Sequence, residues 1–202
     1  GSDYTAVAGP AQVSVADGSA TGTINVAVTD DALLEALETV ICQISNSSNA
    51  AVTITGASAT ANITDNDTAN AVLSVTTHGN EAGPVDITYT VTLSKTNNTG
   101  AAVTFDFDDL GTGTAASGSD YTAVAVAAQV SVANGAATGT INVLVTDDAL
   151  LEALETVNCQ ISNSSNAAVT ITGASATANI TDNDAANAVL SVTTHGNEAG
   201  PV

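Results

Sequence analysis

Residues 87–93 read Ile-Thr-Tyr-Thr-Val-Thr-Leu, with an apolar side chain at every second position. Successive side chains of a β-strand point to opposite faces, so this stretch predicts a strand with one buried face and one solvated face. Similar alternation marks the short segments 72–75, 103–107, 130–132, 141–145, 157–161, 169–171 and 176–180. Because Gly, Asn and Pro separate these segments, we predict an all-β fold, an antiparallel β-sandwich with Greek-key connections.

The chain repeats itself. Gly1-Ser-Asp-Tyr-Thr-Ala-Val7 returns as Gly118-Ser-Asp-Tyr-Thr-Ala-Val124, and residues 1–85 match 118–202 at all but seven positions, with an offset of 117. This period is too long for one coil of a solenoid and has the size of one small domain. The sequence therefore predicts a tandem array of one domain.

The array is out of register with the ends of the sequence. Taking the unit to begin at Ala71, we interpret residues 71–187 as one complete repeat. Residues 1–70 are then the C-terminal part of a preceding repeat, and residues 188–202 are the N-terminal start of the next. We expect either a window on a longer repetitive chain or ends that are completed by neighbouring subunits.

The charge of the chain is strongly one-sided. Twenty-one acidic residues face one basic residue, Lys95, and the formal net charge is −20. Nucleic acids and anionic membranes are excluded as electrostatic partners, because phosphate binding requires Lys and Arg. No apolar stretch approaches the roughly 20 residues of a membrane span, so we expect no membrane insertion in this segment. The carboxylates must be solvated, protonated or matched by metal ions.

Each copy carries one cysteine, Cys42 or Cys159. A single cysteine per domain cannot form a disulfide within that domain. The alternation places Cys159 on the same face as Val157 and Ile161, so we interpret it as a small buried apolar side chain. An interchain disulfide or a reactive thiol is the alternative.

One segment breaks the strand pattern. Residues 147–155, Asp-Asp-Ala-Leu-Leu-Glu-Ala-Leu-Glu, are rich in helix formers and begin with a possible Asp N-cap, which predicts one or two helical turns. In a helix Asp148, Glu152 and Glu155 would share one face, while Leu151 and Leu154 would turn inward. Like charges on one face repel each other, and a bound cation would relieve this repulsion.

Further acidic residues lie in the predicted turns. Glu81 lies in the first loop, Asp120 in Gly118-Ser-Asp-Tyr121, and Asp182 and Asp184 at the end of the last strand. Ca²⁺ takes six to eight oxygen ligands and tolerates irregular geometry. Solvated turns are the alternative for each motif alone, but their combination without cations favours a metal site.

These motifs, in this order, resemble the Calx-β repeat of Na⁺/Ca²⁺ exchangers, integrin β4 and bacterial surface proteins. The resemblance covers residues 71–187 and, at the same offsets, 1–70. It implies an immunoglobulin-like sandwich that binds Ca²⁺ among the loops at one end. Ala149 replaces a third Asp of the calcium-sensing members, and Asn183 interrupts their final acidic triplet, so we expect fewer or more weakly bound ions.

The resemblance also implies the metal ligands. In the complete repeat they are Glu81, Asp120, Asp147, Asp148, Leu150 through its backbone carbonyl, Glu152, Glu155, Asp182 and Asp184. In the partial copy they are Asp3, Asp30, Asp31, Glu35, Glu38, Asp65 and Asp67.

The leading hypothesis is a structural one: Ca²⁺-stiffened repeats that form the extracellular stalk or filament of a bacterial cell-surface adhesin. Its partners would be neighbouring repeats of the same chain, with lateral or end-to-end association of identical chains as a further option. The alternatives are a glycan- or partner-binding adhesive module and a regulatory Ca²⁺-sensing domain.

We expect no enzyme. His78 and His195 occupy the same turn position in two copies, and neither has an adjacent nucleophile. Asn-x-Ser/Thr sequences, such as those at Asn46, Asn97 and Asn163, are possible glycan acceptors, although a chain rich in Asn and Thr contains such triplets by chance.

Overall fold

A computed structural model describes residues 3–194, 196 and 198 of the chain. Every regular element in these residues is a strand. The strands are β1 (Leu34–Glu35), β2 (Glu38–Gln43), β3 (Ser58–Ile63), β4 (Ala69–Thr77), β5 (Gly79–Asn80), β6 (Ile87–Leu93), β7 (Asn97–Asn98), β8 (Val103–Asp109), β9 (Gln129–Val132), β10 (Thr138–Val143), β11 (Glu155–Ser162), β12 (Val169–Gly173) and β13 (Ser175–Thr181).

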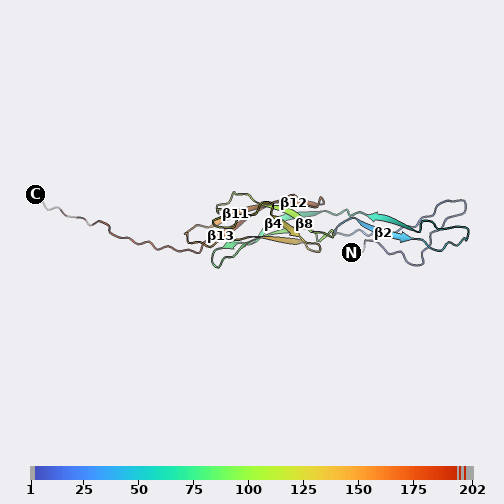
Figure 1. Ribbon diagram of the computed structural model, residues 1–202, viewed down its shortest axis with the longest axis horizontal. Helices are drawn as coiled ribbons and strands as arrows, with labels where there is room; N and C mark the ends of the chain where they lie inside the picture. The colour runs from blue at the N-terminus through green and yellow to red at the C-terminus, as the bar shows by residue number, and fades with distance from the viewer. Residues whose placement is uncertain (1–2, 195, 197, 199–202) are drawn as a thin grey trace.

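Nine of these strands form an immunoglobulin-like sandwich of two sheets (Figure 1). One sheet has the order β10-β6-β4-β12 and the other β5-β13-β11-β8-β9. The chain changes sheet after β4, β5, β6, β9, β10, β11 and β12. The predicted all-β sandwich is therefore confirmed.

The core lies between the two sheets and is lined by the alternate apolar residues of each strand. In β6, Ile87, Tyr89, Val91 and Leu93 are all buried. The ring centroids of Tyr89 and Phe107 lie 5.4 Å apart across the core, with the rings tilted by 60°. Tilted pairs at this separation add to the stabilisation from burial alone.

Most strand pairs are antiparallel, but both sheets end in a parallel pair. β12 pairs with β4 in one sheet, and β5 pairs with β13 in the other. The alternation of apolar residues does not distinguish these pairings, because it depends on the face of a strand and not on its direction.

Residues 147–154 form an extended loop, so the predicted helical turns are wrong. The backbone N–H of Leu150 donates to Asp148 Oδ1 (2.7 Å), and that of Glu152 donates to Asp182 Oδ2 (2.7 Å). The Glu152 N–H, which a helix would direct to the carbonyl of Asp148, is thus taken by a side-chain carboxylate. Leu151 and Leu154, expected to turn inward, are exposed.

The partial copy, residues 3–68, has much less regular structure. β2 and β3 form a two-stranded antiparallel sheet (Figure 1), and no strand spans residues 5–33. Val15 is 56% exposed, whereas Val132, at the same place in the complete repeat, is fully buried. Strands β4, β6 and β8 have no counterparts in this copy, so its apolar side chains have no opposing sheet to pack against.

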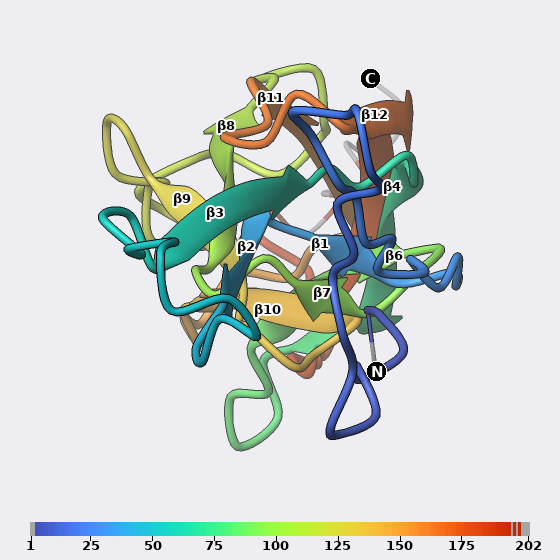
Figure 2. The same cartoon turned by 90° about the vertical axis from the view of Figure 1, so that its right-hand side faces the viewer.

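The partial copy contacts the complete repeat through β1. This short strand runs parallel to β7, with Leu34 opposite Asn97 and Glu35 opposite Asn98 (Figure 2). The Lys95 ammonium donates to Asp67 Oδ1 nearby. Only residues 64–68 separate β3 from β4, so the connection between the copies is short.

Cys159 is fully buried and Cys42 is partly buried, and neither forms a disulfide. Burial raises the pKa of the Cys159 thiol to about 11, which keeps it protonated at neutral pH. The interpretation of Cys159 as a small buried side chain is confirmed. Within the part of the chain that the structure describes, no helix has the length and apolar character needed to cross a membrane.

Candidate metal centre

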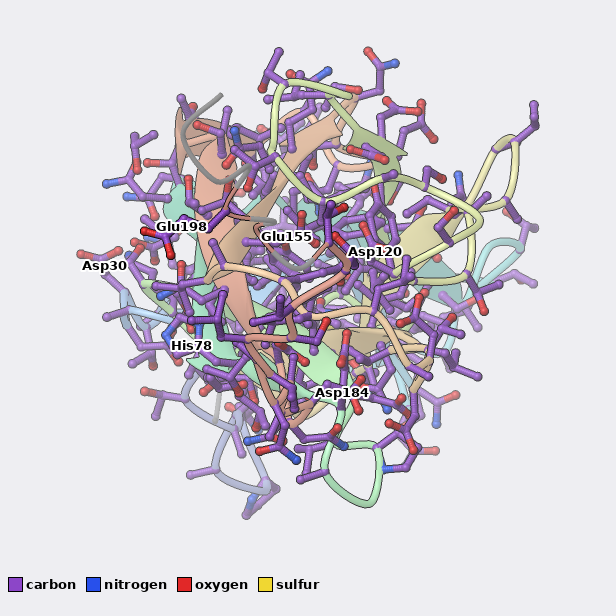
Figure 3. All side chains as sticks on the ribbon, turned by 90° about the vertical axis from the view of Figure 1, so that its left-hand side faces the viewer. Asp30, His78, Asp120, Glu155, Asp184 and Glu198 are labelled. Carbon is purple, nitrogen blue, oxygen red and sulfur yellow. The ribbon has the colours of Figure 1, made fainter. Side chains whose placement is uncertain are left out.

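The acidic side chains predicted as ligands in the complete repeat gather at the end of the sandwich from which residues 185–194 leave it. Figure 3 looks onto this end and labels Asp120, Glu155 and Asp184. Four stretches of chain meet there: the loop after β5, the turn before Tyr121, the loop between β10 and β11, and the end of β13.

Two groups of three carboxylates form within this end. Glu81, Asp182 and Asp184 each place a carboxylate oxygen within 4.8 Å of the others, and so do Asp120, Glu152 and Glu155. Six of the nine predicted ligands of this copy are thereby brought together, from segments up to 103 residues apart in the sequence.

The remaining three lie outside these two groups. Asp147 Oδ1 accepts a hydrogen bond from Asn183 Nδ2 (3.0 Å), and Asp148 Oδ1 accepts the Leu150 N–H already described. Leu150 itself is exposed. These residues shape the loop beside the two groups, and their role as ligands stays a prediction.

Asp182 organises the loop as well as the site. Its Oδ2 accepts the backbone N–H of Glu152, and its Oδ1 accepts that of Asp184 (2.8 Å). These hydrogen bonds hold the pKa of Asp182 below its ordinary value. Asp120 Oδ2 likewise accepts the backbone N–H of Ala116 (2.5 Å), which closes the turn that carries it.

Four carboxyl groups of the two clusters, those of Glu81, Glu152, Glu155 and Asp184, resist ionisation. Burial, together with the neighbouring acids, raises the pKa values of Glu81, Glu152 and Asp184. The same causes raise the pKa of Glu155 to about 7, with burial the larger and a hydrogen bond to Asp120 next. Carboxylates that share one site without a nearby cation repel each other, and this repulsion raises their pKa values by favouring the protonated form.

Several of these oxygens are buried without a partner. Glu81 is 1% exposed, and its Oε2 has no hydrogen bond. Glu155 Oε2 and Asp184 Oδ2 are also buried atoms without a hydrogen bond, although the two residues are partly exposed. Buried polar atoms are almost always satisfied, and an unsatisfied one indicates a missing water or ion. An all-oxygen donor set suits Ca²⁺ better than transition metals, which prefer nitrogen and sulfur ligands. The residues present therefore fit a calcium ion.

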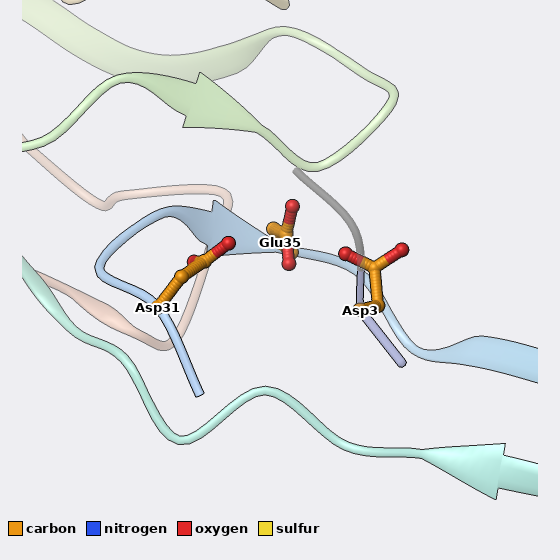
Figure 4. Close-up of side chains that lie close together, drawn as sticks. All are labelled: Asp3, Asp31 and Glu35. Atoms are coloured by element: carbon orange, nitrogen blue, oxygen red, sulfur yellow. The ribbon is translucent and has the colours of Figure 1, made fainter. Parts of the chain in front are cut away.

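The partial copy repeats the arrangement in part. Asp3, Asp31 and Glu35 converge within 4.8 Å (Figure 4). An open pocket beside them is lined by all seven predicted ligands of this copy: Asp3, Asp30, Asp31, Glu35, Glu38, Asp65 and Asp67. Asp65 Oδ2 accepts the backbone N–H of Glu35 (2.8 Å), as Asp182 does for Glu152.

Three contacts near the site were not expected from the sequence. Asp67 pairs with Lys95, Asp86 Oδ1 accepts the backbone N–H of Val145 (3.1 Å), and Asp109 Oδ2 accepts the Tyr121 hydroxyl (2.5 Å). The one available signal was that Lys95 is the single basic residue. Asp109 is the last residue of β8, after the buried Phe105 and Phe107.

Comparison with known proteins gives one family. The sequence pattern of the Calx-beta domain matches residues 1–67 and 73–184. A search of curated proteins gives no match.

Three solved structures are similar to the chain. The first, described as CBD12 from CALX1.2, shows 20% identity and a TM-score of 0.43 over 56% of this chain and 44% of that chain. The second, an apo-form Calx CBD1 domain, shows 23% identity and a TM-score of 0.45 over 58% of this chain and 99% of that chain. The third, the calcium binding domain CBD12 of CALX1.1, shows 18% identity and a TM-score of 0.43 over 55% of this chain and 44% of that chain. The chain thus covers less than half the length of the two CBD12 structures.

Proposed function

The chain belongs to the Calx-beta domain family, and we propose that its repeats bind Ca²⁺ and form the extended stalk of a bacterial cell-surface adhesin. The proposal joins two parts: a calcium site at one end of each repeat, and a structural role for the array that the repeats build.

The calcium site rests on one observation, the buried carboxylate oxygens without partners at the end of the complete repeat. These oxygens are Glu81 Oε2, Glu155 Oε2 and Asp184 Oδ2, and each of the three residues places a carboxylate oxygen within 4.8 Å of two other carboxylates. The single basic residue, Lys95, is paired with Asp67 of the partial copy. No lysine or arginine is left to balance this end, and a bound Ca²⁺ would supply the missing positive charge.

The structural role is supported by the repetition and by the junction. Residues 1–85 recur at 118–202 with few changes, which favours length over a unique site. The copies lie end to end along the long axis of the molecule (Figure 1). Because the acidic loop of the partial copy is next to this junction, an ion bound there would limit bending between copies.

The proposed location is extracellular, at the cell surface, and the proposed partners are neighbouring repeats of the same chain. The excess of acidic residues suits an environment in which Ca²⁺ is abundant, because weak sites with millimolar affinities are filled only there. No catalytic role is proposed.

A regulatory Ca²⁺ sensor is the second candidate. It is favoured by the raised pKa values of Glu81, Glu152 and Glu155, because a site that is strained without its ion changes most when the ion binds. The near-identity of the copies favours the stalk, since a sensor needs one site and not an array.

The glycan-binding alternative is weakened by the aromatic residues. Sugar recognition uses exposed aromatic faces, but Tyr89, Phe105, Phe107 and Tyr121 of the complete repeat are all buried. Their rings build the core and leave no stacking platform on the described surface of residues 71–187.

Thermal melting of the whole chain in EDTA, Ca²⁺ or Mg²⁺ tests the calcium site. A ligand at about 100 times its Kd adds about 2.7 kcal/mol to the free energy of unfolding, so Ca²⁺ should raise the melting temperature by several degrees. Mg²⁺ should raise it less, because it demands a regular octahedron. Equal melting temperatures in all three solutions would refute the calcium site.

The stalk is tested by small-angle X-ray scattering of the whole chain with and without Ca²⁺. If ions restrict bending at the junction, the maximum dimension should be larger and its distribution narrower in Ca²⁺. A sensor without a stiffening role would bind Ca²⁺ in the melting experiment and leave these dimensions unchanged.

A further inference from the structure

At the junction between the two copies, a leucine of the partial copy packs into the core of the complete repeat. Leu34 is fully buried, and its neighbours in the buried apolar cluster are residues of the complete repeat, from Ala69 to Ile180. Of the described residues 3–68, Leu34 alone belongs to this cluster. The acidic loop of one copy is thus anchored in the core of the next.

The equivalent leucine of the complete repeat is Leu151, 117 residues further on. Both lie in the same sequence, Asp-Asp-Ala-Leu-Leu-Glu-Ala-Leu-Glu, yet Leu34 has no exposed surface and Leu151 is 65% exposed. Local sequence therefore does not decide the burial of this leucine. Its burial depends on whether a neighbouring repeat is docked against it.

An ion pair accompanies the leucine. Asp67 at the end of the partial copy pairs with Lys95, which lies between β6 and β7 of the complete repeat. The equivalent of Asp67 is Asp184, which has one oxygen buried without a partner. The far end of the complete repeat thus carries the same two side chains, Leu151 and Asp184. Among the described residues, Leu151 has no neighbouring core to enter, and Asp184 has no lysine to pair with.

We propose that the surface around Leu151 and Asp184 is a docking surface for a further copy of this repeat. That copy would receive Leu151 at the place where the complete repeat receives Leu34, beside its own equivalent of β7. Its lysine at the position of Lys95 would pair with Asp184. The occupant is identified by continuity with the existing junction and by charge: the unit carries one lysine, and at the junction that lysine is used in docking.

A second molecule of the same chain does not suit this surface, because its Lys95 and its β7 edge are already occupied by its own Asp67 and Leu34. The inference rests on the array in the proposed function but not on calcium. Docking made by an apolar side chain and an ion pair should persist in EDTA, so it can be tested separately from metal binding.

The test compares matched leucine variants in two chains, the 202-residue chain and a chain lengthened beyond Val202 by the sequence of residues 86–187, both in EDTA. In the 202-residue chain, Leu34→Ala should lower the melting temperature by about 5 °C or more, and Leu151→Ala should leave it within about 1 °C. In the lengthened chain Leu151→Ala should become as damaging as Leu34→Ala.

Thiol alkylation gives a second readout that does not depend on overall stability. In a Cys42→Ser background, Leu151→Cys should react at least about tenfold more slowly in the lengthened chain than in the 202-residue chain, as expected if the docked state holds about 90% of the population. Leu34→Cys should react slowly in both. Replacing the lysine of the added copy by alanine should partly restore the reactivity at position 151.

The inference is overturned if Leu151→Ala is neutral and Leu151→Cys reacts equally fast in both chains. That result would leave the calcium site untouched, because Ca²⁺-dependent melting is measured separately. Conversely, protection of position 151 without any effect of Ca²⁺ would support docking and refute the calcium site.

Discussion

Asp182 and Glu152 are joined by a hydrogen bond of 2.7 Å from the backbone N–H of Glu152 to the carboxylate of Asp182. The partial copy contains the same bond between Asp65 and Glu35, at 2.8 Å. This bond ties the loop before β11 to the end of β13, so that Glu152 lies beside Asp120 and Glu155. Asp182 is therefore a member of the group with Glu81 and Asp184, and through its bond to Glu152 it also positions the group with Asp120 and Glu155.

Asp182→Ala should destabilise the chain even without metal. The substitution removes the acceptor for two backbone N–H groups, each bond contributing about 1 kcal/mol, so we expect a loss of about 2 kcal/mol in the free energy of unfolding in EDTA. Urea denaturation measures this loss. No change in EDTA would mean that water replaces Asp182 and that the loop needs no anchor.

Glu81→Gln should have the opposite effect in EDTA. Glu81 is buried among like charges, and the neutral amide removes a charge that burial and Asp182 disfavour. The metal-free chain should melt at a higher temperature, while Ca²⁺ affinity should fall about tenfold or more because a ligand is lost.

Asp108→Asn is the control for Glu81→Gln. Asp108 is exposed on β8, outside both carboxylate groups, so its loss should change neither the EDTA melting temperature nor the Ca²⁺ affinity beyond small effects. Equal responses of the two variants would indicate that only the net charge matters, and not a site.

The stability of the metal-free chain should fall as the pH rises towards neutrality. The folded-state pKa of Glu155 is raised from 4.5 to about 7, so the protonated form is favoured by folding. That stabilisation is complete below pH 4.5 and is lost as the pH rises through about 7. Glu81, Glu152 and Asp184 act in the same direction, and the lowered pKa of Asp182 acts oppositely, below its ordinary value of 3.8.

Melting temperatures between pH 4.5 and 8 check this dependence. In EDTA they should decrease with pH, and in Ca²⁺ the decrease should vanish or reverse, because the ion binds the ionised carboxylates. The same slope in both solutions would contradict Ca²⁺ binding at these groups.

Two valines in nearly identical sequence should respond differently to truncation. Val132→Ala removes a fully buried side chain and should cost about 2–3 kcal/mol. Val15→Ala, in the partial copy, removes a side chain that is 56% exposed and should change stability by less than about 0.5 kcal/mol. Urea denaturation of both variants measures the difference. Equal costs would show that the partial copy is packed in solution.

Tyr89→Phe should cost about 1 kcal/mol, because the buried Tyr89 hydroxyl donates to the carbonyl of Val157 at 2.8 Å and the carbonyl loses this donor. Phe107→Ala, which empties the other half of the aromatic pair, should cost about 3–5 kcal/mol. Neither should alter Ca²⁺ affinity measured by titration of the folded protein, which separates core effects from site effects.

Much of the fold could be predicted from the sequence because strand periodicity is a local property. The alternation in residues 87–93 and around Phe105 predicted both the strands and their buried faces. The prediction failed at residues 147–155, where helix propensity favoured a helix. There the carboxylates of Asp148 and Asp182 capture backbone donors, and one of these acceptors lies 30 residues away from its donor.

The sequence by itself determined the acidic character of the site, its repetition every 117 residues and the lack of internal cations to balance it. It could not determine the grouping of the carboxylates, because Glu81 and Asp184 meet only when β5 pairs with β13. Nor could it distinguish Leu34 from Leu151, which share the same neighbours in sequence. Only the tertiary structure decided that one is buried and the other exposed, since burial depends on the domain that packs against the residue and not on the residue itself.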